Sequence, residues 1–220
     1  MNTVRDYFDS LAPGWNGRYQ RRRDYRNRAA VFAMEIERER GAGNVETILE
    51  IGCGACGVLG PENDDGISYF GCDLSFRMLR LNPRRGKIFQ ADLLKMPVKG
   101  RFDMVVMSSV LEWMGDPLES PGILSGLLRP GGILLVSYPN TRGLFRIVER
   151  RVVRPLRRAL KGSHYTDLQK VKDYGNLKRA FQKHGFRLKR AVFFGKKLAV
   201  QGRYSSSMEL DVYQYRRGGE

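Results

Sequence analysis

The residues of this chain best suited to chemistry are closely spaced glycines that directly follow an apolar run containing a carboxylate. The whole segment is ILEIGCGACG, residues 48 to 57. Its carboxylate is Glu50, and its glycines are Gly52, Gly54 and Gly57. Glycine has no Cβ, so a loop built on these residues can turn tightly and let a ligand approach the backbone. Such a loop after a buried strand is typical of nucleoside-cofactor sites, although a tight strand-to-helix turn without a ligand would use the same residues.

A second carboxylate follows at the spacing that a ribose contact requires. Asp73 ends a short apolar stretch, residues 67 to 72, roughly 20 residues after the glycines. A carboxylate at the end of a strand can accept hydrogen bonds from both ribose hydroxyls, in nicotinamide and adenosyl cofactors alike. The alternative is a helix N-cap, because a helix is expected to begin near Ser75, and the two roles are compatible.

Further apolar stretches indicate the strands that must position these groups. They span residues 87 to 90, 104 to 107 and 133 to 138, the last after a Pro130-Gly131-Gly132 turn. The first ends before Asp92 and the second before Ser108. In an open parallel sheet the ligand crevice lies outside the carboxyl ends of the strands, so these polar groups are placed for binding. On this pattern a dinucleotide-binding fold remains open.

Five segments in order along residues 45 to 140 resemble the successive motifs of class I S-adenosylmethionine-dependent methyltransferases. They are EIGCGACG, GCDLSFRML, QADLLKMP, FDMVVMSSVLEWM and LLRPGGILLVSYPN. Five motifs in register are far more specific than one glycine loop. The resemblance implies an α/β fold, a Rossmann-like three-layer sandwich with a seven-stranded, mostly parallel sheet and an antiparallel last strand. It also implies S-adenosyl-L-methionine as the cofactor.

The same resemblance assigns cofactor contacts along these motifs. Glu50 and the glycine loop would lie along the methionine and ribose portion, Asp73 would hold the ribose hydroxyls, and Asp92 would meet the adenine amine. Ser108 would contact the cofactor near the acceptor, although a plain strand-end serine is an equal alternative. The rest of the predicted set is Leu74, Met78 and Leu93 around the adenine, with Gly52, Cys53, Gly54 and Gly57 in the loop.

The two flanks resemble a narrower group, the small-molecule O-methyltransferases of the ubiquinone-biosynthesis type. The matching segments are VRDYFDSLAPGWN and KGSHYTDLQKVKDYGNLKRAFQKHGF. The resemblance implies lid and substrate-side segments around a small or lipid-linked acceptor that is methylated at oxygen. The tract Leu111-Glu112-Trp113 lacks the histidine that those enzymes use in a divalent-metal cluster, so no metal is expected.

His164, in the KGSHYTD segment, is the candidate general base. A near-neutral imidazole can accept the proton of a phenol or hydroxyl during methyl transfer. A loop histidine that only anchors the lid is the alternative. Aromatic residues expected to close over the site and exclude water, with ordinary aromatic packing as their alternative role, are Tyr7, Trp15, Tyr19, Trp113 and Tyr165.

One catalytic domain accounts for the length and composition, since the chain has 220 residues of which 42% are hydrophobic. We expect residues 1–44 to form an N-terminal helical lid segment and residues 45–220 to form the methyltransferase domain, with a basic helical insertion at about 142–175. No apolar run approaches the roughly 20 residues of a membrane span, and the first residues lack the apolar core of a secretory signal. These features predict a cytoplasmic protein.

The positive charge is concentrated outside the expected cofactor-binding core. The formal net charge is +16 at pH 7, whereas acids and bases nearly cancel between residues 46 and 140. Residues 143 to 162, GLFRIVERRVVRPLRRALKG, place apolar side chains at near-helical spacing among arginines, and Pro155 is expected to kink or divide that helix. A basic amphipathic helix suits peripheral contact with an anionic membrane, and a solvated lid helix is the alternative.

The sequence thus predicts a monomeric or homodimeric S-adenosylmethionine-dependent methyltransferase acting on a small or lipid-linked acceptor. An RNA methyltransferase would explain the same charge, because lysines and arginines neutralise phosphates. The chain shows no appended RNA module, no DPPY-like or NPPY-like tetrad and no Pro-Cys pair, so nucleic acid is the less favoured partner. A non-catalytic cofactor-binding protein that docks a partner is a third alternative.

Overall fold

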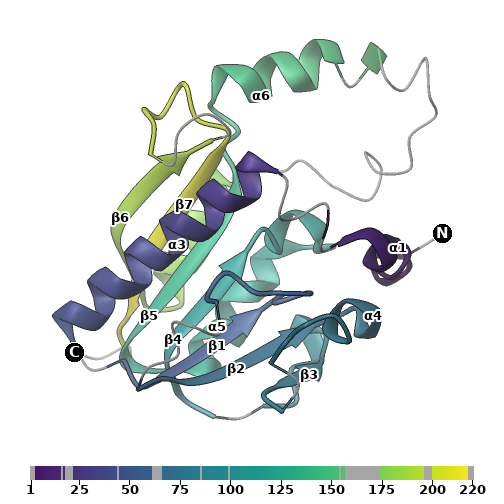
Figure 1. The fold of residues 1–220 in the computed structure, drawn as a ribbon. Helices are drawn as coiled ribbons and strands as arrows, with labels where there is room; N and C mark the ends of the chain where they lie inside the picture. The colour runs from purple at the N-terminus through teal and green to yellow at the C-terminus, as the bar shows by residue number, and fades with distance from the viewer. Residues whose placement is uncertain are drawn as a thin grey trace.

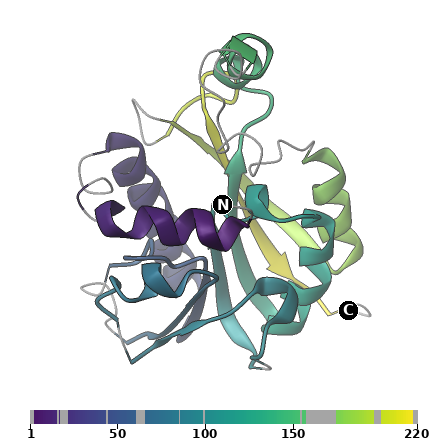
Figure 2. The same ribbon diagram turned by 90° about the vertical axis from the view of Figure 1, so that its right-hand side faces the viewer.

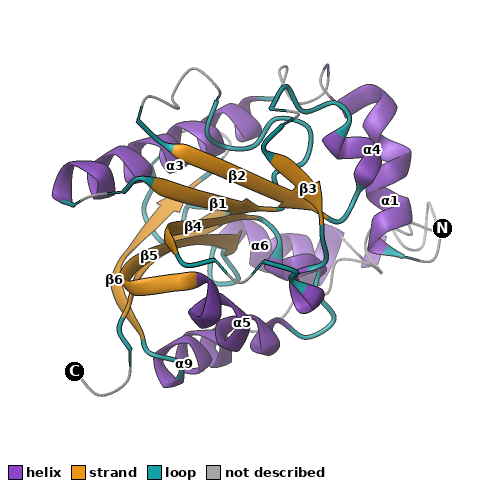
Figure 3. Cartoon of the chain, turned by 90° about the horizontal axis from the view of Figure 1, so that it is seen from below, coloured by secondary structure: helices purple, strands orange, loops and turns teal. Residues whose placement is uncertain are grey.

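One seven-stranded sheet with helices on both faces forms the centre of the molecule (Figures 1 and 3). This computed structural model describes residues 3–15, 17, 22–43, 45–60, 66–84, 86–98, 100–153, 155–156, 174–195 and 200–217. The layered α/β arrangement confirms the predicted Rossmann-like sandwich.

The strand order is β3-β2-β1-β4-β5-β7-β6. In chain order the strands are β1 (Thr47–Ile51), β2 (Ser68–Asp73), β3 (Ile88–Gln90), β4 (Phe102–Ser108), β5 (Leu128–Pro139), β6 (Phe186–Phe194) and β7 (Met208–Tyr215). The first five pair in parallel, and β7 runs antiparallel to both β5 and β6. The chain turns from β3 back to β4 on the other side of β1, so the switch point of the sheet lies at the carboxyl ends of β1 and β4.

Strand β5 begins earlier than the sequence predicts. The Pro130-Gly131-Gly132 segment, expected as a turn ahead of the strand, forms an irregularity inside it. Phe102 of β4 pairs with Leu128, yet Met104 already pairs with Ile133, so β5 carries extra residues between these two pairs. Gly131 has a φ of 82°, a left-handed conformation that favours glycine. The pairing of β4 with β5 resumes at Ile133, where the strand was expected to start.

Two helical layers bury the sheet. Helix α3 (Arg23–Ala42) covers one face, while α5 (Ser120–Leu127) and α9 (Gly175–Lys183) cover the other (Figure 3). Phe32 and Ile36 of α3 are fully buried against strand residues, among them Met104. On the opposite face Leu124 of α5 and Phe181 of α9 pack in a second core cluster.

The predicted boundary at residue 44 therefore does not separate a lid from the domain. Helix α3 lies within residues 1–44, but its buried side chains share a core with β1, β4, β5 and β7. The part before α3, namely α1 (Val4–Leu11) and the short η1 (Ala12–Gly14), lies over the carboxyl ends of the strands together with the beginning of α3, whose Tyr25 and Arg28 line the same cavity. Most of α3 therefore belongs to the core of the domain, and the lid role of the segment before it stays a prediction.

Helix α1 is held against the turn after β2. Thr3 caps the helix by accepting a hydrogen bond from the backbone N–H of Asp6 at 3.1 Å. The Ser75 hydroxyl donates to Asp9 Oδ1 at 2.5 Å, just ahead of α4 (Phe76–Leu79). Ala12 packs with Met78 in a small third cluster. Figure 2 shows α1 lying across the molecule next to α4.

The remaining described elements are short. They are the 3₁₀ turns η3 (Leu93–Lys95), η4 (Leu111–Trp113) and η5 (Pro117–Glu119), the helix α6 (Leu144–Val148) and the π-helix η6 (Glu149–Val153). The last two begin the predicted basic insertion, and residues 154 and 157–173 of it lie outside the described residues. Among the helices that the structure describes, none combines the length and apolar character that crossing a membrane requires.

Candidate active site

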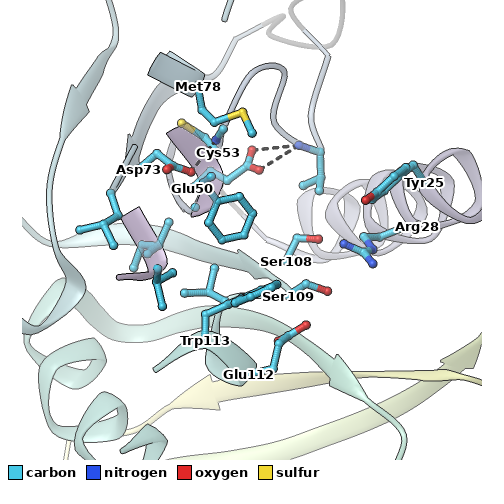
Figure 4. Close-up of a pocket in the computed structure, with 18 of the residues that line it drawn as sticks. Tyr25, Arg28, Glu50, Cys53, Asp73, Met78, Ser108, Ser109, Glu112 and Trp113 are labelled. Carbon is cyan, nitrogen blue, oxygen red and sulfur yellow. Dashed lines mark hydrogen bonds between the residues drawn. The ribbon is translucent and has the colours of Figure 1, made fainter. Parts of the chain in front are cut away.

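A cavity of about 940 Å³ lies at the switch point of the sheet and extends from the glycine loop toward α3 (Figure 4). Glu149 and Val153 of η6 also line it. Every residue of the predicted cofactor set lines it: Glu50, Gly52, Cys53, Gly54, Gly57, Asp73, Leu74, Met78, Asp92, Leu93 and Ser108. Residues predicted from separate motifs are thus brought into one place. Their contacts with the cofactor stay a prediction.

The glycine loop needs glycine for conformation and for space. Gly52 and Gly57 have φ values of 77° and 65°. A Cβ at Gly52 would lie 2.5 Å from Cγ2 of Val110, and a Cβ at Gly57 would lie 2.7 Å from Oε2 of Glu50. The backbone N–H of Gly52 also donates to the Cys72 carbonyl at 2.7 Å, which ties the loop to the end of β2. The loop is therefore packed tightly against β2, the end of β4 and Glu50.

Glu50 holds the far side of this loop. Its carboxylate accepts hydrogen bonds from the backbone N–H of Val58 and from the hydroxyl of Tyr69, both at 2.9 Å. The Arg84 guanidinium lies over the Tyr69 ring, 3.9 Å from its centroid. Burial raises the pKa of Glu50 to about 7, although these hydrogen bonds and the charge of Arg84 act in the opposite direction. Sequence reasoning found Glu50 but missed Tyr69 and Arg84. Both residues are far from Glu50 along the chain, and nothing in the sequence links them to it.

Asp73 joins the glycine loop to α4. Its Oδ2 accepts from the backbone N–H of Gly54 at 2.9 Å, and its Oδ1 accepts from that of Ser75 at 2.8 Å. Ser75 itself is the N-cap of α4, because its Oγ accepts from the backbone N–H of Met78. The alternative that Asp73 caps this helix is therefore wrong. Burial raises the pKa of Asp73 to about 6, opposed by the two backbone hydrogen bonds and reinforced by the charge of Asp9.

The expected adenine end of the cavity combines apolar side chains with an exposed carboxylate. Met78 and Leu93 are buried, and Leu74 lines the cavity beside them. Asp92 is exposed, and its Oδ1 accepts from the backbone N–H of Leu94 at 3.0 Å as the N-cap of η3. Asp92 thus has a structural role besides the predicted contact with the adenine amine.

The end of β4 forms one wall of the acceptor side. Ser109 follows Ser108 with a φ of 59°, and no other described residue except glycine has a positive φ. Its backbone N–H donates to the Ser137 hydroxyl at 3.2 Å. The Ser109 hydroxyl is buried without a hydrogen-bond partner among the described residues. Such local strain often marks functional sites, but sequence reasoning missed Ser109 because its conformation leaves no trace in the residue pattern.

Aromatic side chains of α1 close the cavity above this wall. Tyr7 stacks on Trp113 with ring centroids 5.4 Å apart, and Phe8 meets the same indole edge-on at 4.9 Å. Trp15 lies farther along, 5.8 Å from Tyr25 of α3. Three of the predicted lid aromatics, Tyr7, Trp15 and Trp113, therefore line the cavity.

The opposite wall comes from the beginning of α3. Tyr25 and Arg28 line the cavity across from Ser108, Ser109 and Glu112 (Figure 4). The Arg28 guanidinium lies 5.4 Å from the Tyr25 ring centroid, and its Nε is buried without a hydrogen-bond partner among the residues that the structure describes. Arg28 was not among the site residues that the sequence predicts.

Three predicted residues have no described position. His164, the candidate base, and the aromatics Tyr19 and Tyr165 lie outside the described residues. Within the described part of the chain, no group of three His, Cys, Asp or Glu side chains is placed to hold a metal ion.

Comparisons with known proteins agree on one family. A family model described as "Methyltransferase domain" matches residues 18–190. A malonyl-[acyl-carrier protein] O-methyltransferase of Enterobacter lignolyticus is 27% identical over 143 residues, which are 60% of this chain and 56% of that protein. The chain thus spans about half the length of this curated relative.

Solved structures share the fold across nearly the whole chain. Magnesium protoporphyrin IX methyltransferase of Synechocystis PCC 6803, with bound S-adenosylhomocysteine, has a TM-score of 0.72 at 17% identity, covering 97% of this chain and 98% of its own. The N-methyltransferase NodS of Bradyrhizobium japonicum WM9, in complex with S-adenosylhomocysteine, has a TM-score of 0.68 at 16% identity. The match covers 98% of this chain and 100% of the NodS chain.

The family model covers most of the chain, and the sheet order and the glycine loop agree with it. The dinucleotide-binding alternative is therefore set aside. This chain belongs to the methyltransferase domain family, within the class I S-adenosylmethionine-dependent methyltransferases.

Proposed function

We propose that this methyltransferase transfers the methyl group of S-adenosylmethionine to an oxygen of a small or lipid-linked acceptor that carries a carboxylate or phosphate. The observation that carries this proposal is the Arg28 guanidinium at the acceptor side of the cavity. The curated relative supports it, because that protein is named as an O-methyltransferase of malonyl-[acyl-carrier protein], and a malonyl group contains a carboxylate.

Arg28 is suited to an anion because a buried N–H donor without a partner costs free energy. Its Nε is such a donor among the described residues, and Tyr25 supports the guanidinium from one side. A planar guanidinium pairs with carboxylate or phosphate through two parallel hydrogen bonds, which fixes the orientation of the ligand as well as its charge. An acceptor held in this way would have a defined position relative to the wall formed by Ser109.

The cofactor supplies a methyl group already activated by a sulfonium, so the protein must mainly align the acceptor and remove its proton. The aromatic wall of Tyr7 and Trp113 would exclude water from the reacting groups. His164 is the proposed base, and its segment follows the helix η6 that lines the same cavity. Arg28 would bind and orient the acceptor without taking part in proton transfer.

Replacing Arg28 with Ala is expected to raise KM for anionic acceptors roughly 10- to 100-fold, because a charge-assisted hydrogen bond contributes about 1.5–3 kcal/mol. Affinity for S-adenosylhomocysteine should be unchanged, because the cofactor residues lie on other elements. Initial rates of methyl transfer to a panel of small carboxylates and phosphates, paired with their neutral esters, measure the effect. Arg28→Lys should fall between wild type and Ala, since lysine keeps the charge but not the planar pair of donors.

Arg26→Ala is the matched control. Arg26 lies on the same helix, but its side chain is exposed and does not line the cavity. The control should keep the wild-type KM. A KM that is unchanged in Arg28→Ala, or a clear preference for the neutral esters, would contradict an anionic acceptor.

RNA methylation is the second candidate, because the net charge of +16 would attract a polyanion. The same rate assay with structured RNA in place of small acceptors separates the two. We expect RNA to accept no methyl groups. Methyl transfer to RNA that weakens steeply with salt would favour the alternative.

A further inference from the structure

The helix that follows β5, made of α6 and η6, and the two described residues after it carry a row of exposed apolar side chains. Leu144, Val148, Val152 and Leu156 are 64%, 54%, 56% and 62% exposed. They are spaced by four residues, and the helix lies at the outer end of the molecule, away from the middle of the sheet (Figures 1 and 2). Side chains at this spacing are neighbours on a helix surface, so Leu144, Val148 and Val152, which lie on α6 and η6, form one stripe. Leu156 lies beyond the end of η6 and is a further exposed apolar side chain.

The change from α-helix to π-helix helps to keep the stripe straight. In an α-helix of 3.6 residues per turn, a spacing of four overshoots a full turn. In a π-helix, with its wider turn, the same spacing falls short of one. Because α6 (Leu144–Val148) is followed directly by η6 (Glu149–Val153), the two deviations oppose each other. From Leu144 to Val152 the stripe would extend roughly 12 Å at about 1.5 Å per residue.

A second element extends this exposed surface. The backbone N–H of Leu144 donates to the carbonyl of Tyr204 at 2.9 Å, which places the β6–β7 connection beside the start of α6. Tyr204 is 65% exposed, and Val200 in the same connection is 53% exposed. Asn140 fixes this connection by donating to the Arg203 carbonyl at 2.6 Å. Tyrosine is favoured where an apolar environment meets water, because its ring is apolar and its hydroxyl is polar.

Cations surround the apolar residues. The side chains of Arg142, Arg151 and Arg203 are exposed. The sequence also has Arg146, Arg150 and Arg154 in this stretch, and its acids between residues 142 and 203 are Glu149, Asp167 and Asp173. We call the exposed residues on these two elements the α6 surface, made up of Leu144, Val148, Val152, Leu156, Val200 and Tyr204 with Arg142, Arg151 and Arg203.

We propose that the α6 surface binds an anionic lipid bilayer, with its apolar row inserted at the headgroup level and its arginines on lipid phosphates. An apolar stripe flanked by arginines has the composition of helices that lie in a membrane interface. Basic residues near such a surface each add attraction to anionic lipids. A second copy of this chain is a poorer occupant, because pairing two α6 surfaces would bring like charges together.

Docking in this orientation would also place the cavity next to the bilayer. Glu149 and Val153 belong to the same helix and line the cavity, one position after the exposed Val148 and Val152. One helix therefore borders the cavity and presents the apolar row. An amphiphilic acceptor would then enter directly from the bilayer. This consequence rests on the proposed function, whereas binding of the bilayer itself does not.

Flotation with lipid vesicles tests the proposal on the full chain. We expect wild type to float with vesicles of phosphatidylcholine and phosphatidylglycerol, and much less with phosphatidylcholine alone. Val148→Asp combined with Val152→Asp should lower partitioning at least tenfold, because two charges would enter the apolar row. The matched control is Met34→Asp combined with Leu118→Asp, since these side chains are 43% and 42% exposed on other elements. The control should bind vesicles as wild type does.

Three results would overturn the proposal. They are recovery of wild type entirely in the unbound fraction, vesicle binding by the Val148/Val152 variant as tight as that of wild type, and an equal loss of binding in the control pair. A dimer by light scattering that the Val148/Val152 variant abolishes, or binding to an acidic acyl carrier protein with none to vesicles, would assign the surface to a protein instead. Rates with a soluble acceptor and no vesicles report on the proposed function separately, and they should be equal in both pairs of variants.

Discussion

Replacing Asp73 with Ala is expected to weaken binding of S-adenosylmethionine and S-adenosylhomocysteine roughly 100- to 10,000-fold. If the carboxylate accepts from both ribose hydroxyls, the variant loses two charge-assisted hydrogen bonds of about 1.5–3 kcal/mol each, and every 1.4 kcal/mol is about tenfold in affinity. Asp73 also holds Gly54 and Ser75 through their backbone N–H groups, so the loop that faces the cofactor would loosen as well. Calorimetric titration of purified variants measures the effect.

Two further variants separate the ribose contact from loop stability. Asp73→Asn keeps the shape and one acceptor oxygen, so it should fold with a Tm nearer to wild type yet still bind cofactor weakly. Asp92→Ala removes an exposed carboxylate that caps η3, and we expect a loss of no more than about tenfold. A folded Asp73→Ala protein with wild-type cofactor affinity would refute the ribose assignment.

Replacing His164 with Ala is expected to lower turnover roughly 100-fold or more, while cofactor affinity stays nearly intact. General acid–base catalysis by a positioned side chain contributes about 10²- to 10⁴-fold, and the expectation assumes that His164 takes the acceptor proton. In wild type, turnover should rise with pH as the imidazole loses its proton, and this dependence should disappear in the variant. Single-turnover rates across pH 5–9 measure both effects.

His184→Ala is the matched control, because the chain has only two histidines. His184 ends α9, with its Nδ1 2.9 Å from the Ala180 carbonyl, and it does not line the cavity. This control should keep wild-type turnover and its pH dependence. If His164→Ala keeps wild-type turnover, His164 is not the general base, and the alternative role of a lid anchor is favoured.

The strands and the cofactor side of the cavity could be predicted because both are local in sequence. Apolar runs mark β1 and β4, and the glycines mark a loop whose conformation other residues rarely adopt. Gly185 follows the His184 C-cap of α9 with a φ of 84°, the conformation that glycine commonly adopts at a helix end. In each case the signal and the structure it specifies lie within a few residues.

The place of α3 could not be predicted, because long-range pairs allow its charged residues to be buried. Glu35 is fully buried and accepts from Arg190 Nε at 2.6 Å, and buried Glu39 accepts from Lys189 Nζ at 2.6 Å. The two cations lie on β6, far away along the chain. Burying a carboxylate costs free energy unless it is paired. Because the sequence alone does not show that Arg190 and Lys189 pair with these carboxylates, it predicts a polar, exposed helix.

The acceptor wall was missed for the same reason. Arg28 and Ser109 belong to segments that meet only in the folded chain. Arg28 stands in none of the five motifs, and Ser109 stands in the fourth, where nothing in the residue pattern distinguishes it from Ser108. Arginines are frequent in the N-terminal segment, so composition did not distinguish Arg28 from exposed neighbours such as Arg26.

Titration of the wild-type protein with S-adenosylhomocysteine from pH 5 to pH 8 tests the placement of the cofactor most directly. Burial raises the pKa of Asp73 to about 6, and ribose hydroxyls donate best to the ionised carboxylate. Affinity should therefore tighten as the pH rises toward about 6, by up to tenfold per pH unit, and level off above it. Absence of binding at every pH would contradict a cofactor site in this cavity. Binding that does not change with pH would contradict a contact between Asp73 and the ribose.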